Sequence, residues 1–175
     1  MSATSGIDFT ALSLRDAFDL ALLIEEEACE RYEELAHQME AHHTPDAARF
    51  FRFMAGNEEK HRAALAARRR ERFGDAPARL TRAMLFDVEA PDYDEARAFM
   101  TARAALEAAL RAEAKAHAFF AGILPGLRDA DVRTLFEDLR NEEIEHEALV
   151  RRELARLPPD PGLPPDDFAD EPVGH

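Results

Sequence analysis

The sequence has a single cysteine, Cys29, and no tryptophan among its 175 residues. One cysteine excludes an internal disulfide bond and any metal module that needs four cysteine ligands. No stretch approaches the roughly 20 consecutive apolar residues that cross a bilayer. The opening residues also lack a basic segment followed by a long apolar run, so we expect no signal peptide. These absences favour a protein of the cytoplasm or another reducing compartment, with no membrane partner.

Basic residues are scarce relative to acidic ones. The chain has 36 Asp and Glu residues against 22 Lys and Arg residues, which gives a formal net charge of −14. Binding to nucleic acid needs a basic surface, so this balance disfavours a nucleic-acid partner. The one basic cluster, Arg68–Arg72, ends a predicted helix, where positive charge complements the helix dipole. An anion site is the less favoured alternative, and the surplus acidic charge would instead attract cations.

Glycine is also rare, with 7 residues, while Leu, Ala, Glu and Arg dominate, as in all-helical proteins. Four segments have helical periodicity, and we expect helices over about residues 13–41, 45–73, 93–122 and 129–157. Ser13 begins a sequence that resembles a capping box, and Asp92 and Glu95 have the same spacing. Thr44 is the expected N-cap of the second helix, with Pro45 at its first position.

The lengths of the connections predict the topology. The first two helices and the last two are joined by short connections, so each pair should form an antiparallel hairpin. Roughly twenty residues separate the hairpins; at ~3.3 Å each they could reach ~66 Å, beyond the ~45 Å of a thirty-residue helix. A four-helix bundle with one long crossover is the ferritin-like topology. We therefore predict an all-α ferritin-like bundle over residues 13–157, after an N-terminal arm (1–12) and before an extended, Pro-rich acidic tail (158–175).

Each predicted helix has an apolar seam with steps of three and four residues, which marks the face toward the core. Every seam is interrupted only near its middle, and only by glutamate and histidine. The interrupting residues are Glu25 in the first helix, Glu58 and His61 in the second, Glu113 in the third, and Glu143 and His146 in the fourth. At ~1.5 Å rise per residue, all six lie within about two turns of one level.

These residues predict a metal site with two ions. An unpaired carboxylate in an apolar core costs several kcal/mol, and two histidines cannot neutralise four glutamates. A divalent metal can supply the missing positive charge, and oxygen with imidazole ligands suits iron, manganese or zinc. The alternative is that these glutamates lie on the surface of a purely structural bundle.

An internal repeat supports the two-ion interpretation. The interval from Glu58 to Glu143 equals that from His61 to His146, so two similar hairpins would provide two half-sites. Tyr32 lies two turns from Glu25 on the same seam, and its hydroxyl could hydrogen-bond a ligand carboxylate from the second or fourth helix. The alternative for Tyr32 is a core residue bonded to some other group.

The combined motif resembles the rubrerythrin branch of the ferritin-like superfamily. It consists of Glu25-x6-Tyr32, Glu58-x2-His61, Glu113-x6-Phe120 and Glu143-x2-His146. The resemblance implies a di-iron carboxylate centre in which Glu58 and Glu143 bridge or chelate and Glu25 and Glu113 bind terminally. It implies an oxidoreductase that oxidises Fe(II) with peroxide or O2, in oxidative stress or iron handling. Zinc or manganese could substitute for the two iron ions.

Three departures from the family pattern accompany this resemblance. Rubrerythrins usually carry an extra glutamate one turn beyond the third-helix ligand, where this chain has Ala116, so the six-ligand set is more similar to a bacterioferritin site. The rubredoxin-like domain of the family, which serves as a built-in electron donor, needs four cysteines, whereas this chain has one. We therefore expect an external electron donor. The position that matches Tyr32 in the second half is Phe120, which has no hydroxyl.

Other residues near the seams are given ordinary roles. We expect Cys29 and His117 to be packing residues, and the glutamates that flank the ligands to form solvated faces: Glu26, Glu27, Glu59, Glu142 and Glu145. The alternative for one or two of these glutamates is that they guide cations inward, and the sequence does not identify which. A different class of function is a non-catalytic metal-binding or cargo module recruited through the acidic tail. Two or more chains, in the simplest case a homodimer, are expected to associate.

Overall fold

The computed structural model describes residues 7–84 and 101–158, and the regular secondary structure of this part of the chain is entirely helical, without strands. The long helices are α1 (Leu14–Ala41), α2 (Pro45–Phe73), α3 (Ala102–Ile123) and α4 (Ala130–Arg156). Three short 3-10 turns accompany them: η1 (Phe9–Ala11), η2 (Arg82–Met84) and η3 (Leu124–Gly126). The predicted all-α bundle is confirmed. Residues 1–6 of the predicted arm and most of the predicted tail lie outside the described residues.

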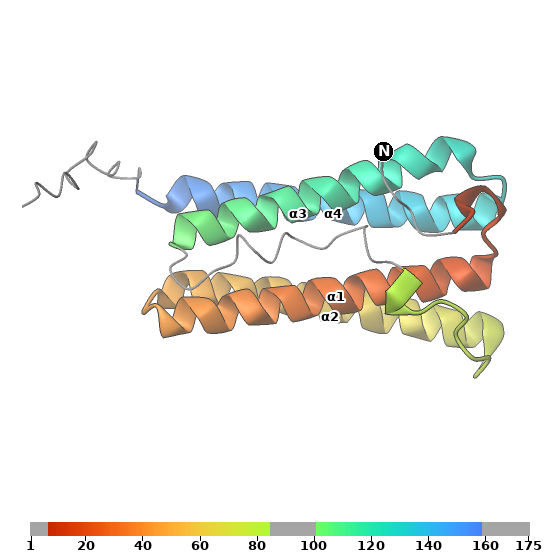
Figure 1. Ribbon diagram of the computed structural model, residues 1–175, viewed down its shortest axis with the longest axis horizontal. Coiled ribbons are helices and arrows are strands. Elements are labelled where there is room, and N and C mark those ends of the chain that lie inside the picture. The colour runs from red at the N-terminus through yellow and green to blue at the C-terminus, as the bar shows by residue number, and fades with distance from the viewer. Residues whose placement is uncertain (1–6, 85–100, 159–175) are drawn as a thin grey trace, which may run out of the picture.

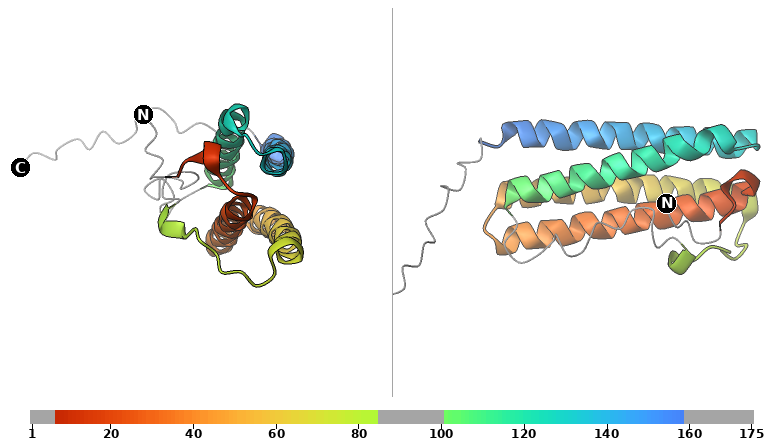
Figure 2. Two further views of the ribbon diagram at one scale, coloured as in Figure 1. Left: turned by 90° about the vertical axis from the view of Figure 1, so that its right-hand side faces the viewer. Right: turned by 45° about the horizontal axis from the view of Figure 1, so that its top comes forward.

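The helices form two antiparallel pairs, α1 with α2 and α3 with α4, along one long axis (Figure 1). Seen end-on, the four helices occupy the corners of a bundle (Figure 2). In Figure 1, α2 ends at the right and α3 begins at the left, which is the arrangement of two hairpins joined by a long crossover. None of the described helices is both long enough and apolar enough to cross a membrane.

Polar side chains set the beginnings of three helices. The hydroxyl of Ser13 accepts a hydrogen bond from the amide of Asp16 at the start of α1, and Thr101 and Asp129 cap α3 and α4 in the same way. Thr44 is different, because its hydroxyl donates to the carbonyl of Met39 instead of capping α2. The predicted capping box of the third helix, at Asp92 and Glu95, lies outside the described residues.

The core consists of two apolar clusters, one toward each end of the bundle. The first apolar cluster includes Phe18, Leu20, Phe120, Phe136 and Leu139. The second apolar cluster includes Tyr32, Met39, Phe51, Met54 and Leu106. On every helix, the glutamates and histidines of the seams come between the residues of the two clusters. The structure therefore encloses a polar layer between two apolar halves.

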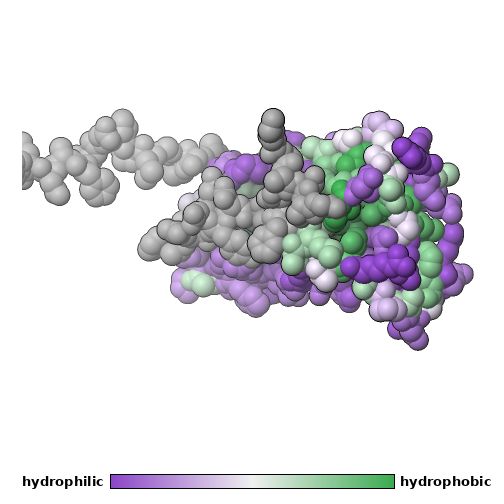
Figure 3. All heavy atoms as spheres, turned by 45° about the vertical axis from the view of Figure 1, so that its right-hand side comes forward, coloured by the Kyte–Doolittle hydropathy of each residue, from purple (hydrophilic) through white to green (hydrophobic). Residues whose placement is uncertain are grey.

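The end of the bundle near η1 is closed by aromatic and ionic contacts. Phe9 packs edge-on against Phe119, with ring centroids 5.4 Å apart. Asp19, which is buried, accepts hydrogen bonds from Arg69 (2.5 Å) and from the backbone amide of Arg79 (3.2 Å). This carboxylate therefore ties the segment after α2 to α1. Figure 3 shows hydrophobic residues gathered toward this end of the molecule.

Candidate metal centre

The polar layer between the apolar clusters contains all six residues that the seams predict. Five of them are buried, with 3 to 7% of each residue exposed: Glu25, Glu58, Glu113, Glu143 and His146. His61 is the exception, since 28% of its side chain is exposed. The alternative that the glutamates lie on the surface is therefore wrong, and the helix faces inferred from the seams are confirmed.

The two histidines reach the glutamates from α2 and α4. His146 Nδ1 lies 3.2 Å from Glu58 Oε1 and 3.5 Å from Glu113 Oε2. His61 Nδ1 lies 3.9 Å from carboxylate oxygens of both Glu25 and Glu58. The imidazole rings stack with centroids 5.3 Å apart and planes 11° from parallel. The carboxylate of Glu58 thus approaches both histidines, one with each oxygen, and reaches both halves of the layer.

Three groups of donor atoms are close enough to hold a metal ion, with all atoms of a group within 4.8 Å of one another. The groups are Glu58 with His61 and His146; Glu25 with His61 and Glu142; and Glu113 with Glu143 and His146. All six predicted residues therefore converge at one place. The groups overlap through the histidines, as expected of one site with room for more than one ion.

Glu142 is the donor that the sequence interpretation missed. It was expected on a solvated face, but the side chain is only 34% exposed and its Oε2 lies 3.7 Å from His61 Nδ1. Its position immediately before Glu143 puts it about 100° around α4 from the core seam. That angle directs it toward α2 rather than outward. The seam pattern alone contained no signal for this contact, because it depends on how α2 and α4 pack.

The electrostatic environment of the two histidines differs. Burial, followed by the neighbouring His146, lowers the pKa of His61, so its imidazole is neutral near pH 7 and can bind a metal. Burial alone would also lower the pKa of His146, but the hydrogen bond and negative charge of Glu113 outweigh it, and the pKa is raised. The pKa of Glu113 is in turn lowered despite burial, because His146 and Glu143 hydrogen-bond to it.

Tyr32 is fully buried in the second apolar cluster and its hydroxyl donates a hydrogen bond to Glu113 Oε1. The sequence predicted a bond to a carboxylate of the second or fourth helix, and this is wrong, since Glu113 belongs to α3. The ring stacks on Phe51, with centroids 6.1 Å apart. Burial, then the charges of Glu113 and Glu58, raise the pKa of Tyr32 well above its usual range, so the hydroxyl stays protonated as a donor.

The donor set fits divalent metal ions. His61 Nδ1 is buried and makes no hydrogen bond within the described part of the chain. A buried polar nitrogen without a hydrogen bond is costly, and coordination to a metal would satisfy it. Carboxylate oxygens with imidazole nitrogens suit iron, manganese and zinc, and the positive charge offsets four glutamates in an enclosed layer.

Two residues beside the seams have more specific roles than apolar packing. His117 Nδ1 lies 2.9 Å from Glu147 Oε1, and the other oxygen of Glu147 pairs with Arg151, so His117 belongs to a polar group between α3 and α4. Cys29 is partly buried and its thiol faces the carbonyl of Ala55 at 3.5 Å. Burial raises the pKa of the Cys29 thiol, which disfavours the reactive thiolate.

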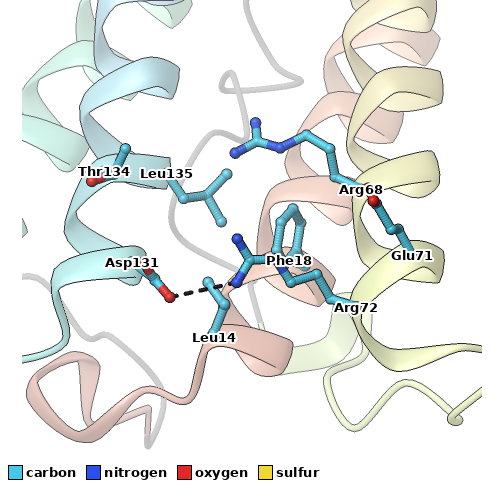
Figure 4. Close-up of a pocket in the computed structure, with 8 residues that line it drawn as sticks. All are labelled: Leu14, Phe18, Arg68, Glu71, Arg72, Asp131, Thr134 and Leu135. Carbon is cyan, nitrogen blue, oxygen red and sulfur yellow. Dashed lines mark ion pairs between the residues drawn. The ribbon is translucent and has the colours of Figure 1, made fainter.

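The basic cluster contributes to a pocket of about 160 Å³ between α1, α2 and α4 (Figure 4). Arg72 points across it to Asp131, at 3.5 Å. The guanidinium of Arg68 lies 5.4 Å from the ring centroid of Phe18 and 3.8 Å from Asp138. Both arginines are therefore near carboxylates, which argues against the anion-site alternative.

A four-helix bundle with a buried layer of glutamates and histidines is the arrangement found in helical carboxylate proteins that bind metals within the bundle. The sequence model of the Rubrerythrin family matches residues 16–154, and the chain belongs to this family. This confirms the resemblance inferred from the motifs.

The fold is also similar to a crystal structure of an uncharacterized conserved protein from Magnetospirillum magnetotacticum MS-1. The two chains are 27% identical with a TM-score of 0.73, over 87% of this chain and 100% of that one. None of the curated proteins matches this chain.

Proposed function

We propose that this protein binds two metal ions, iron in the native state, in the polar layer between its apolar clusters, and that it oxidises Fe(II) with peroxide or O2. The proposed ligands are Glu25, Glu58, His61, Glu113, Glu143 and His146. The observation that supports this most strongly is the convergence of two Glu-x2-His motifs and two further glutamates on overlapping groups of donor atoms inside the bundle.

The chain's own residues would perform separate tasks in this site. Glu58, whose carboxylate oxygens lie 3.9 Å from His61 Nδ1 and 3.2 Å from His146 Nδ1, would serve both ions, while His61 and His146 would supply nitrogen ligands. Tyr32 holds Glu113 in one orientation through its hydroxyl. The two apolar clusters limit the access of water from either end of the bundle. When bound, iron would supply the redox chemistry that these side chains cannot.

Metal analysis of protein produced with added iron, combined with its optical spectrum, tests the binding. We expect about two ions per chain, as the paired half-sites require. Glu58→Gln should lose bound metal, because it removes the carboxylate between the histidines. Glu59→Gln is the matched control: it is the next residue on α2, is exposed, and pairs with Arg62 at the surface. Equal metal content in both variants would contradict the assignment.

Mixing the loaded protein with Fe(II) and peroxide tests the activity. We expect about two Fe(II) oxidised per peroxide consumed, since peroxide takes up two electrons and two protons to form water. The rate should exceed that of Fe(II) without protein, and Glu58→Gln should abolish the difference. A protein that binds metal in full but does not accelerate oxidation would instead be a metal-binding module without catalysis.

A further inference from the structure

The two sides of the polar layer differ in their exposure to solvent. On one side, Glu113, Glu143 and His146 are all at least 93% buried. On the other, Glu25 is buried, but His61 is 28% exposed and the Glu142 side chain 34% exposed. The layer therefore opens toward solvent between α2 and α4, and Glu142 lies at that opening.

The internal repeat does not explain Glu142. Glu142 precedes Glu143 in α4, and the residue that precedes Glu58 at the matching position in α2 is Asn57. A carboxylate therefore occurs in one hairpin where the other has a neutral amide. The carboxylate is also turned inward: Glu142 Oε2 is 3.7 Å from His61 Nδ1, and its donor group includes the buried Glu25.

We propose that Glu142 is an additional ligand of the metal ion on the His61 side, completing a group of Glu25, His61 and Glu142 that takes up a divalent cation from solvent. This inference rests on the proposed function, because it assigns a seventh ligand to the same site. A carboxylate oxygen is a good ligand for divalent cations of the first transition row. Its partial exposure lets Glu142 contact a hydrated ion before the ion reaches the buried ligands.

The alternative is that Glu142 acts only through its charge, as any acidic residue near the opening would. Glu145 provides the comparison. It lies on the same helix, it is exposed, and its negative charge also acts on His61. It is absent from every group of donor atoms found among the described residues. Replacement of Glu145 by Gln therefore removes the same charge near the site without removing a proposed ligand.

Cobalt(II) titration of the metal-free protein distinguishes the two roles. Co(II) reports affinity by titration and coordination by its visible spectrum, which strengthens as the number of ligands falls. We expect wild type and Glu145→Gln to bind two Co(II) ions with the same spectrum. Glu142→Gln should bind one of the two ions at least about tenfold more weakly, the lower end of the loss seen when metal sites lose supporting partners. Its visible bands should change for that ion.

Three results would overturn the proposal. In the first, Glu142→Gln matches wild type in affinity and spectrum. In the second, Glu142→Gln and Glu145→Gln weaken binding equally with unchanged spectra, which would mean that Glu142 acts only through its charge. A wild type that binds no Co(II) would overturn the proposed function as well, so the two failures are distinguishable. Thermal melts of the metal-free variants control for folding, and the partly exposed Glu142 should tolerate glutamine.

Discussion

Replacement of Tyr32 by phenylalanine tests whether the polar layer is organised by the hydrogen bond to Glu113. The ring of Tyr32 is fully buried and stacks on Phe51, so phenylalanine can fill the same space. The hydroxyl is lost, and Glu113 Oε1 loses a donor inside the bundle. A hydrogen bond to a charged group contributes about 1.5–3 kcal/mol to stability. For a chain of this size, 1 kcal/mol shifts Tm by about 2–4 °C, so Tm should fall by ~3–12 °C.

The loss of stability should depend on pH. The pKa of Glu113 is lowered in the folded protein, through His146 and Glu143 first and then Tyr32. A lowered folded-state pKa contributes stability above the unfolded-state value, about 4.3 for glutamate, and this contribution disappears as the pH falls through the folded-state pKa. Tyr32→Phe should raise the pKa of Glu113. The variant should therefore be most impaired near neutral pH and approach wild type in acid.

Calorimetry of the metal-free proteins between pH 7 and the acid limit of folding measures this difference. Phe51→Leu is the matched control, because it disturbs the ring against Tyr32 and keeps the hydroxyl. The stability that Phe51→Leu loses, about 0.5–3 kcal/mol as for most core changes, should be independent of pH. If the stability lost in Tyr32→Phe is equally independent of pH, the hydrogen bond is not its cause, and the loss reflects packing alone.

Three further predictions concern the metal, the ionic tie at Asp19 and the electron donor. Zn(II) or Fe(II) should raise Tm, since an ion at 100 times its Kd adds about 2.7 kcal/mol, and identical melts with and without metal would count against a buried site. Asp19→Ala should destabilise the fold by about 3 kcal/mol or more, because it leaves the largely buried guanidinium of Arg69 without its carboxylate partner. Arg70→Ala, in an exposed pair, should change stability by less than about 0.5 kcal/mol in denaturant titrations. Because the chain has one cysteine, sustained peroxide consumption should require an added electron carrier; turnover with NADH alone would disprove this requirement.

Much of the fold could be predicted from the sequence because its signals are local. Ser13 caps α1 as predicted, and Gly74 ends α2 with φ of 59°, a conformation that glycine adopts without strain. The seams also have a period that only a helix satisfies, so they identified the buried face of each helix. Thr44 shows the limit of such signals: its hydroxyl could cap α2 or bond backward to Met39, and the structure has the latter.

The six proposed ligands could be predicted because burying a glutamate in an apolar seam costs free energy, so its presence there indicates a specific role. Two contacts of the site that could not be predicted depend on packing between hairpins. The motif does not specify that Tyr32 of α1 reaches Glu113 of α3, nor that Glu142 turns toward His61. Both contacts join residues of different hairpins, and periodicity within one helix carries no information about the neighbour that a side chain meets.

The differences between the two halves matter as much as their repetition. The repeat gives each hairpin one Glu-x2-His motif and one further glutamate, so an ideal twofold site would treat two ions equally. This chain departs from that symmetry: Tyr32 is matched by Phe120, and Glu142 by Asn57. Burial lowers the pKa of His61, whereas Glu113 keeps that of His146 raised. If the proposed ions bind, a cation on the His146 side would have to lose its water among buried groups, while one on the His61 side would keep contact with solvent. The repeated motif supplies the proposed ligands, and these unrepeated residues make the two sides unequal in access and charge.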